Sequence, residues 1–111
     1  MADTESPVAD TLAMMTAISI ENSGLPDREL MLARIAALVA VDAPPASYVM
    51  NAGAAVDAGI TLEDVQSLLV AVAPIVGTVR VLSASVSLAK GIGFALDLIE
   101  AELEAAEDDQ V

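Results

Sequence analysis

Apolar residues recur at helical intervals along the chain, in segments that are separated by Pro and Gly. Val and Ile do not alternate with polar residues as they would in half-buried strands, and Ala, the strongest helix former, is abundant. A length of 111 residues suits one ordinary domain. The sequence therefore predicts an all-α fold, a single-domain bundle of five to six helices.

Residue types that start and end helices set the expected boundaries. A flexible acidic N-terminus over 1–7 precedes one helical domain over 8–106, and an acidic tail follows over 107–111. Pro26 suits the first position of a helix, and Gly59 suits the residue after one. The expected helices cover 8–22, 27–41, 44–58, 61 to a break near 74–78, 78–90, and 94–106 after a joint at 91–93.

Two local signals bound the fourth expected helix. Thr61 and Asp64 have the spacing of a capping box, in which each side chain bonds to the other residue's amide. Pro74 lacks the amide that would bond to the Val70 carbonyl, and Gly77 adds conformational freedom. We therefore predict a kink or break near 74–78.

The charge of the chain excludes several partners. Four basic and 17 acidic residues give a net charge of −13, which repels phosphate backbones and anionic lipids, so we expect no nucleic acid and no membrane partner. The uncharged stretch 65–79 is shorter than the ~20 residues of a membrane span. The acidic opening lacks the basic start of a secretion signal, so we expect a cytoplasmic location.

Cys and His are both missing from the sequence. Their absence excludes disulfides, thiol redox chemistry, Cys-ligated zinc and acid–base catalysis by imidazole. We expect no cofactor and no metal site.

The apolar content predicts self-association. Apolar residues make up 56% of the chain, and the mean hydropathy is +0.67, which one small domain cannot hide from water. The second and fourth expected helices have more apolar faces than one protomer can cover. We expect a homo-oligomer.

Four segments carry a resemblance to a known family. They are Leu25-Pro26-Asp27-Arg28 at a helix start, residues 34–40, the run A-x-x-A-G-x-T-x-E-[DE]-[IV] over 55–65, and residues 68–80. Over about 25–95 the chain resembles the carboxymuconolactone decarboxylase family, a branch of the alkylhydroperoxidase D-like superfamily. The resemblance implies an alkylhydroperoxidase D-like fold and a trimer or hexamer, of which we expect the hexamer.

Redox members of that superfamily carry a Cys-x-x-Cys-x-x-x-His stripe on the helix before the Ala-Gly-x-Thr turn. The matching positions here hold Pro44, Ser47 and Asn51. A thiol peroxidase is excluded by residue type, because a hydroxyl and an amide supply neither the thiolate nor the proton relay. If the chain is an enzyme, we expect a decarboxylase- or lyase-like reaction on a lactone acid, with unknown catalytic residues.

The ligand-binding candidates lie on the third expected helix and just after the fourth: Ser47, Tyr48, Asn51, Thr78 and Arg80. Ser47 and Asn51 share one helix face, which the resemblance assigns to the family's pocket. The alternative is structural: Ser47 bonds to the Ala43 carbonyl, and Asn51 satisfies a neighbouring helix. For Tyr48 the alternative is core packing, the more usual role of a buried aromatic residue.

The break near 74–78 would turn Thr78 and Arg80 toward the face with Ser47 and Asn51 and so form a pocket wall. Its alternative is a kink that only curves the helix around oligomeric neighbours. Arg80 could anchor a carboxylate ligand. If Arg80 and Arg34 are buried, they instead require ion pairs, with candidates in the acids Asp42, Asp57, Glu63 and Asp64.

Two functions from different classes follow. The first is a carboxymuconolactone decarboxylase-like protein without redox cysteines that binds or transforms a small carboxylated or apolar metabolite. The second is a catalytically inactive oligomeric scaffold or interaction protein.

Overall fold

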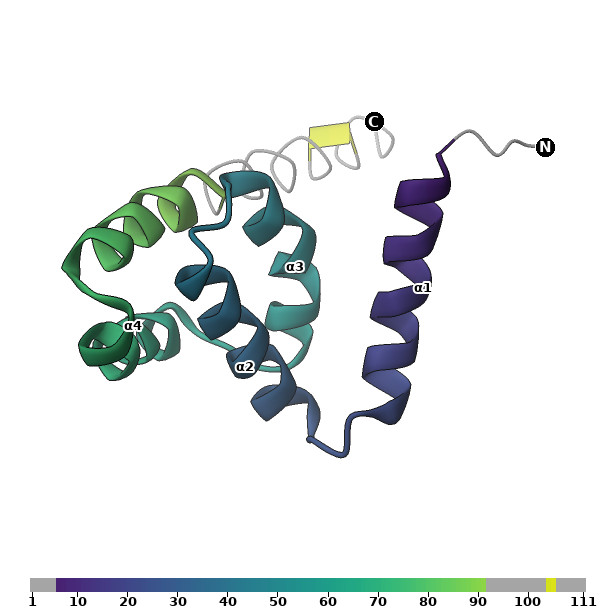
Figure 1. The fold of residues 1–111 in the computed structure, drawn as a ribbon, viewed down its shortest axis with the longest axis horizontal. Helices are drawn as coiled ribbons and strands as arrows, with labels where there is room; N and C mark the ends of the chain where they lie inside the picture. Colours follow the sequence, from purple (N-terminus) through teal and green to yellow (C-terminus); the bar gives the residue numbers. More distant parts are fainter. Residues whose placement is uncertain (1–5, 92–103, 106–111) are drawn as a thin grey trace.

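The computed structural model describes residues 6–91 and 104–105, and this part of the chain contains helices and no strands. Four helices are complete: α1 (Pro7–Asn22), α2 (Asp27–Ala40), α3 (Pro45–Asp57) and α4 (Leu62–Val76). A fifth helix occupies 78–91 (Figure 1). The predicted all-α bundle is confirmed. The expected helix over 94–106 and the Ile92–Gly93 part of the joint lie outside the described residues, except that 104–105 are helical.

Local signals start α1 and α4, and of these only the capping box of α4 is predicted from the sequence. The Ser6 side chain caps α1 by accepting a hydrogen bond from the Ala9 amide at 3.2 Å. The capping box of α4 is complete, because the Asp64 amide donates to Thr61 Oγ1 at 3.1 Å and the Thr61 amide donates to Asp64 Oδ2 at 2.8 Å. These three bonds satisfy amides that have no partner within the helix.

The predicted break lies at Gly77. Helix α4 continues through Pro74 to Val76, and Gly77 then has a φ of 96° and a ψ of 157°, a conformation open almost only to glycine. The chain resumes as a helix at residue 78. The glycine, rather than the proline, therefore sets the turn between the two helices.

Helix α2 is the centre of the bundle, because it packs against both α3 and α4 (Figure 1). One core cluster joins Ile35 and Val39 of α2 to Leu68 and Ala84. A second cluster consists of Ala43, Tyr48, Val65 and Leu88. The partly buried residues Ile60 and Leu69 contact both clusters, so the two form one continuous core.

Helix α1 stands apart from this core (Figure 1). It has no buried residue, and its side-chain link to the bundle is a 3.1 Å hydrogen bond from Arg34 Nη2 to Ser19 Oγ. Its large apolar side chains are more than half exposed: Val8, Leu12, Met14, Met15, Ile18 and Ile20. A lone helix of this length is only marginally stable in water and normally depends on packing against other elements. Within the described residues α1 has little such packing.

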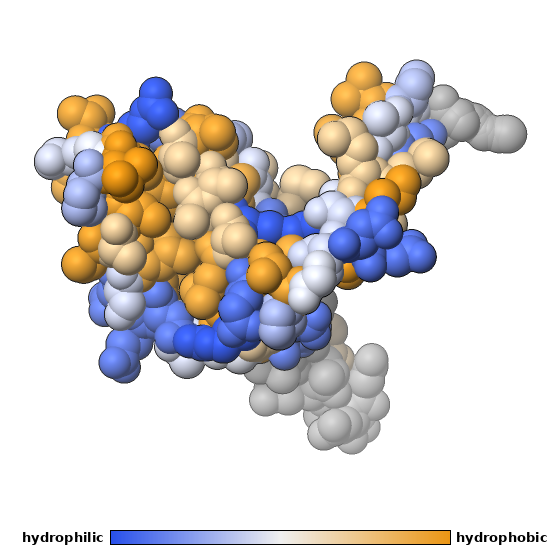
Figure 2. Space-filling model, turned by 60° about the horizontal axis from the view of Figure 1, so that its bottom comes forward, coloured by the Kyte–Doolittle hydropathy of each residue, from blue (hydrophilic) through white to orange (hydrophobic). Residues whose placement is uncertain are grey.

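A second exposed apolar surface covers α4 and the helix after it (Figure 2). Its residues are Val70 and Ile75 of α4, with Val79, Leu82 and Val86 of 78–91. Within the described residues no single helix is long and apolar enough to cross a membrane. Helices α3 and α4 together reach that length and composition, but they are bent by 119°.

Candidate functional site

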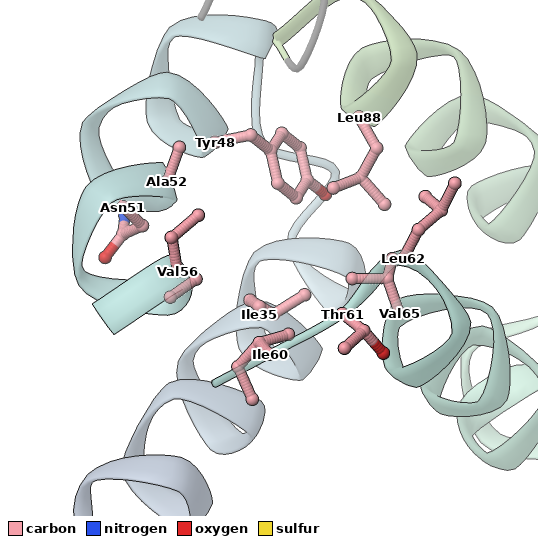
Figure 3. A pocket seen from close by; sticks show the side chains of 11 residues that line it. Ile35, Tyr48, Asn51, Ala52, Val56, Ile60, Thr61, Leu62, Val65 and Leu88 are labelled. Atoms are coloured by element: carbon pink, nitrogen blue, oxygen red, sulfur yellow. The ribbon is translucent and has the colours of Figure 1, made fainter. Parts of the chain in front are cut away.

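A pocket of about 240 Å³ opens between α2, α3, the start of α4 and the helix over 78–91 (Figure 3). Side chains from all four elements line it: Ile35, Tyr48, Asn51, Ala52, Ala55, Val56, Ile60, Thr61, Leu62, Val65 and Leu88. None of these lining residues is charged. The walls are therefore almost wholly hydrocarbon, with three polar side chains among them.

Helix α3 supplies one wall of the pocket. Tyr48, Ala52, Ala55 and Val56 follow one another at spacings of three and four residues or as neighbours, which places them on one helix face (Figure 3). The two alanines are the small members of this face. Their short side chains leave space where a larger residue would fill the pocket.

Tyr48 carries the most unusual polar group in the pocket. Its side chain extends from α3 toward Leu88, and the residue is only 5% exposed (Figure 3). Its hydroxyl is buried and has no hydrogen-bond partner among the described residues. Burial, with a smaller contribution from the negative charge of Asp42, raises the pKa of this hydroxyl, so it stays protonated at neutral pH.

The other two polar side chains already have partners. Asn51 Nδ2 donates to the Ser47 carbonyl at 2.8 Å, so this amide bonds within its own helix and not to a neighbouring one. Thr61 Oγ1 accepts from the Asp64 amide in the capping box. Asn51 also borders a second hollow of about 460 Å³, between α1 and the α2–α3 pair.

An ion pair fixes the loop that leads from α3 to α4. Arg28 donates from Nη2 to Asp64 Oδ1 at 2.7 Å and from Nη1 to Asp64 Oδ2 at 2.9 Å, and Nη1 also bonds to the Gly59 carbonyl at 3.2 Å. The Arg28 hydrogen bonds lower the pKa of Asp64 well below its usual range. By tying α2 to this loop, Arg28 positions Ile60 and Thr61 in the pocket wall.

A glycine lies next to Tyr48 at the start of α3. Gly91 is buried at the end of the helix over 78–91, and an added Cβ would come within 3.1 Å of Tyr48 Cβ and 3.2 Å of the Pro45 carbonyl oxygen. The missing side chain lets this helix approach the start of α3. The sequence analysis predicts Gly91 only as part of a joint between helices, because no local pattern signals its contact with Tyr48.

The structure places the five sequence candidates in two groups. Tyr48 and Asn51 line the pocket together, whereas Ser47 lies on the same helix but is not among the lining residues. Thr78 and Arg80 are also outside the lining, and both are exposed. Arg80 Nη1 donates to the Ala40 carbonyl at the end of α2.

The ion pairs considered for Arg34 and Arg80 are not present among the described residues. Arg34 bonds to Ser19, and Arg80 bonds to a backbone carbonyl. Of the candidate acids, Asp64 pairs with Arg28 and Asp42 accepts from the Ser83 hydroxyl at 2.6 Å. Neither arginine is buried, so the desolvation that would require a carboxylate partner does not arise.

The all-α fold agrees with the comparison with family models. The model of the Carboxymuconolactone decarboxylase family matches residues 7–91, which include all four complete helices and the fifth. The chain belongs to this family. No curated protein and no solved structure matches it significantly.

This member of the family has no Cys and no His, so it cannot form a thiolate or use an imidazole. Pro44, at one of the positions of the missing redox stripe, is the N-cap residue of α3. Within the described residues, no three Asp or Glu side chains are grouped to hold a metal ion. The chemistry of the pocket rests on the polar groups of Tyr48, Asn51 and Thr61.

Proposed function

We propose that the chain is a small-molecule binding protein of the carboxymuconolactone decarboxylase family. Its largely apolar ligand would occupy the pocket between α2, α3, the start of α4 and the helix over 78–91. The uncharged lining of this pocket carries the proposal. Apolar walls with a few placed polar groups are typical of ligand sites. The size is suitable, since an engineered apolar cavity of roughly 150 Å³ already admits benzene.

Of the two ligand types expected from the sequence, the apolar one is favoured over the carboxylated one. A carboxylate in this pocket would lose its water without gaining a cation, because no lining residue is charged. Arg28 is bound to Asp64, and Arg80 is bound to the end of α2. Neither guanidinium lines the pocket.

Binding is favoured over catalysis for a chemical reason. The raised pKa of Tyr48 makes its hydroxyl a hydrogen-bond donor that holds its proton at neutral pH. The amide of Asn51 and the hydroxyl of Thr61 are poor general bases. A decarboxylase- or lyase-like reaction would need a proton acceptor that the lining residues do not include.

A pair of alanine variants on α3 tests the proposal. Ala52→Leu fills the pocket, whereas Ala54→Leu adds the same side chain to the exposed face of the same helix. A panel of lactones, cyclic ketones and muconates is screened by the shift in unfolding midpoint. We expect ligands that stabilise the parent and Ala54→Leu but not Ala52→Leu. Stabilisation of all three alike would contradict binding in this pocket.

The scaffold hypothesis remains the second candidate, because α1 exposes an apolar surface that suits an interaction. We propose that a second copy of the chain covers it, in a homo-oligomer that is a hexamer in preference to a trimer. Helix α1 has no buried residue of its own, and the apolar surface on α4 and 78–91 is exposed as well. The cytoplasmic location expected from the sequence stays a prediction.

A further inference from the structure

We infer that the Tyr48 hydroxyl is the recognition group of the pocket, and that its ligand is a neutral, largely apolar molecule with one hydrogen-bond acceptor, such as a ketone or ester carbonyl. This inference rests on the proposed function, which requires only that the pocket binds a small molecule. It adds the chemical class of the ligand and the atom that selects it.

The first step is that the hydroxyl has no hydrogen-bond partner within the described chain. Phe at position 48 would fill the same space in the cluster with Ala43, Val65 and Leu88, and it would not bury an unpartnered polar atom. Leaving such an atom unpaired is destabilising, so most buried hydroxyls have partners. A hydroxyl that has no partner in the protein, on a side chain that lines a pocket, is suited to bond a molecule in that pocket.

The second step is that the donor is held in place before a ligand arrives. The Tyr48 ring is packed in the second core cluster, and the close approach of Gly91 confines its Cβ. A side chain fixed in this way loses little freedom when a ligand binds. Its hydroxyl therefore selects for the position of the acceptor as well as for its chemistry.

The third step identifies Tyr48 as the lining polar side chain that has no hydrogen bond within the described residues. Asn51 Nδ2 donates to the Ser47 carbonyl, and Thr61 Oγ1 accepts from the Asp64 amide in the capping box of α4. Tyr48 is then the donor that gains most from an acceptor on the ligand. The rest of the ligand meets hydrocarbon, as from Ile35, Val56 and Leu88.

The fourth step excludes an anionic ligand. No cation lines the pocket, and burial, followed by the negative charge of Asp42, raises the pKa of the Tyr48 hydroxyl. The same burial and negative charge oppose a carboxylate that approaches this hydroxyl. A neutral carbonyl accepts the hydrogen bond without carrying a charge into the pocket.

Three probes of nearly equal shape test this inference on the full-length protein. Acetophenone has a carbonyl acceptor, α-methylstyrene replaces the carbonyl oxygen with a methylene group, and benzoate replaces the acetyl group with a carboxylate. Dissociation constants are measured by titration, followed by NMR, for the parent and for Tyr48→Phe. The unfolding midpoint of each protein without ligand is measured in parallel.

For the parent, we expect acetophenone to bind about three- to tenfold more tightly than α-methylstyrene, the range that one neutral hydrogen bond supports, and benzoate to bind most weakly. In Tyr48→Phe the preference for acetophenone should disappear, while α-methylstyrene binds as in the parent. The unfolding midpoint of Tyr48→Phe should equal or exceed that of the parent, because the unpartnered hydroxyl is gone.

Each other outcome overturns a defined statement. Equal binding of acetophenone and α-methylstyrene, or a preference that survives in Tyr48→Phe, overturns the inference and leaves the proposed binding function intact. Tightest binding by benzoate would also overturn the inference and leave the proposed binding function intact. Binding of none of the three probes overturns the proposed function together with the inference, and a lower unfolding midpoint of Tyr48→Phe shows that the hydroxyl has a structural partner.

Discussion

Arg28 joins parts of the chain that are far apart in the sequence and that meet near the pocket. Its guanidinium bonds to both carboxylate oxygens of Asp64 and to the Gly59 carbonyl. The sequence placed Arg28 only in the first turn of a helix. Its partners lie 31 and 36 residues away, a separation that no helical spacing reveals.

The pair makes stability depend on pH in a defined direction. The folded-state pKa of Asp64 is lowered. The ion pair therefore stabilises the fold fully above the unfolded-state pKa of about 4. This stabilisation is lost progressively as the pH falls from that value toward the folded-state pKa. We expect Arg28→Met to lower the unfolding midpoint at pH 7, and the difference from the parent to shrink at pH 3. Thermal unfolding at both pH values measures it.

Glu63→Gln is the matched control for this prediction, because it changes an exposed carboxylate in the same first turn of α4. The unfolding midpoint of Glu63→Gln should stay close to that of the parent at both pH 7 and pH 3. A gap between the parent and Arg28→Met that is the same at pH 3 and pH 7 would mean that the Asp64 carboxylate is not the group that Arg28 stabilises.

At the scale of elements, the connection between α4 and the next helix depends on Gly77 more than on Pro74. Pro74 is exposed in the last turn of α4, while the positive φ belongs to Gly77. The pocket lining contains neither Thr78 nor Arg80. We therefore favour the interpretation that the break at Gly77 only orients the helix over 78–91 against α4. The alternative, that the break forms a wall of the pocket, is disfavoured.

Two substitutions separate these roles. Pro74→Ala restores a backbone donor and should stabilise the protein by about 1 kcal/mol, without a change in ligand binding. Gly77→Ala should destabilise it by about 1–2 kcal/mol, because a Cβ is strained at this φ. Chemical denaturation gives both values. A loss of ligand binding in a stable Pro74→Ala protein would restore the pocket-wall role.

Helix bounds could be predicted from the sequence because their causes are local. Thr61 and Asp64 cap α4 across three residues, and Gly77 ends it directly. The pocket could be predicted only in part. Tyr48 and Asn51 lie on one helix, but Leu88 and Gly91 reach them through the turn at Gly77, whose direction is set by packing and not by neighbouring residues.

The whole molecule exposes more large apolar side chains than it buries, counted over the described residues. That imbalance was predicted from the mean hydropathy, and the surfaces that carry it are α1 and the region of α4 and 78–91 (Figure 2). The acidic chain repels its own copies at long range. The association that we propose would therefore come from short-range apolar packing.

We expect sedimentation at micromolar concentration to give a mass several times the 11.3 kDa of one chain. Leu12→Glu, in the apolar surface of α1, should shift the mass toward the monomer. Ala17→Glu adds the same charge seven residues from Asp10 and four from Glu21, on the acidic side of the helix, and should keep the parent mass. Dissociation of both variants, or a monomeric parent, would contradict assembly through α1.

The binding function is tested most directly by a crystal structure of the protein with acetophenone. It should show density in the pocket behind α3, with the carbonyl oxygen about 2.7 Å from the Tyr48 hydroxyl, the usual O–H···O separation. Ala52→Leu crystals under the same conditions should lack this density. An empty pocket in the parent, or a pocket filled by a side chain of a neighbouring protomer, would contradict the account.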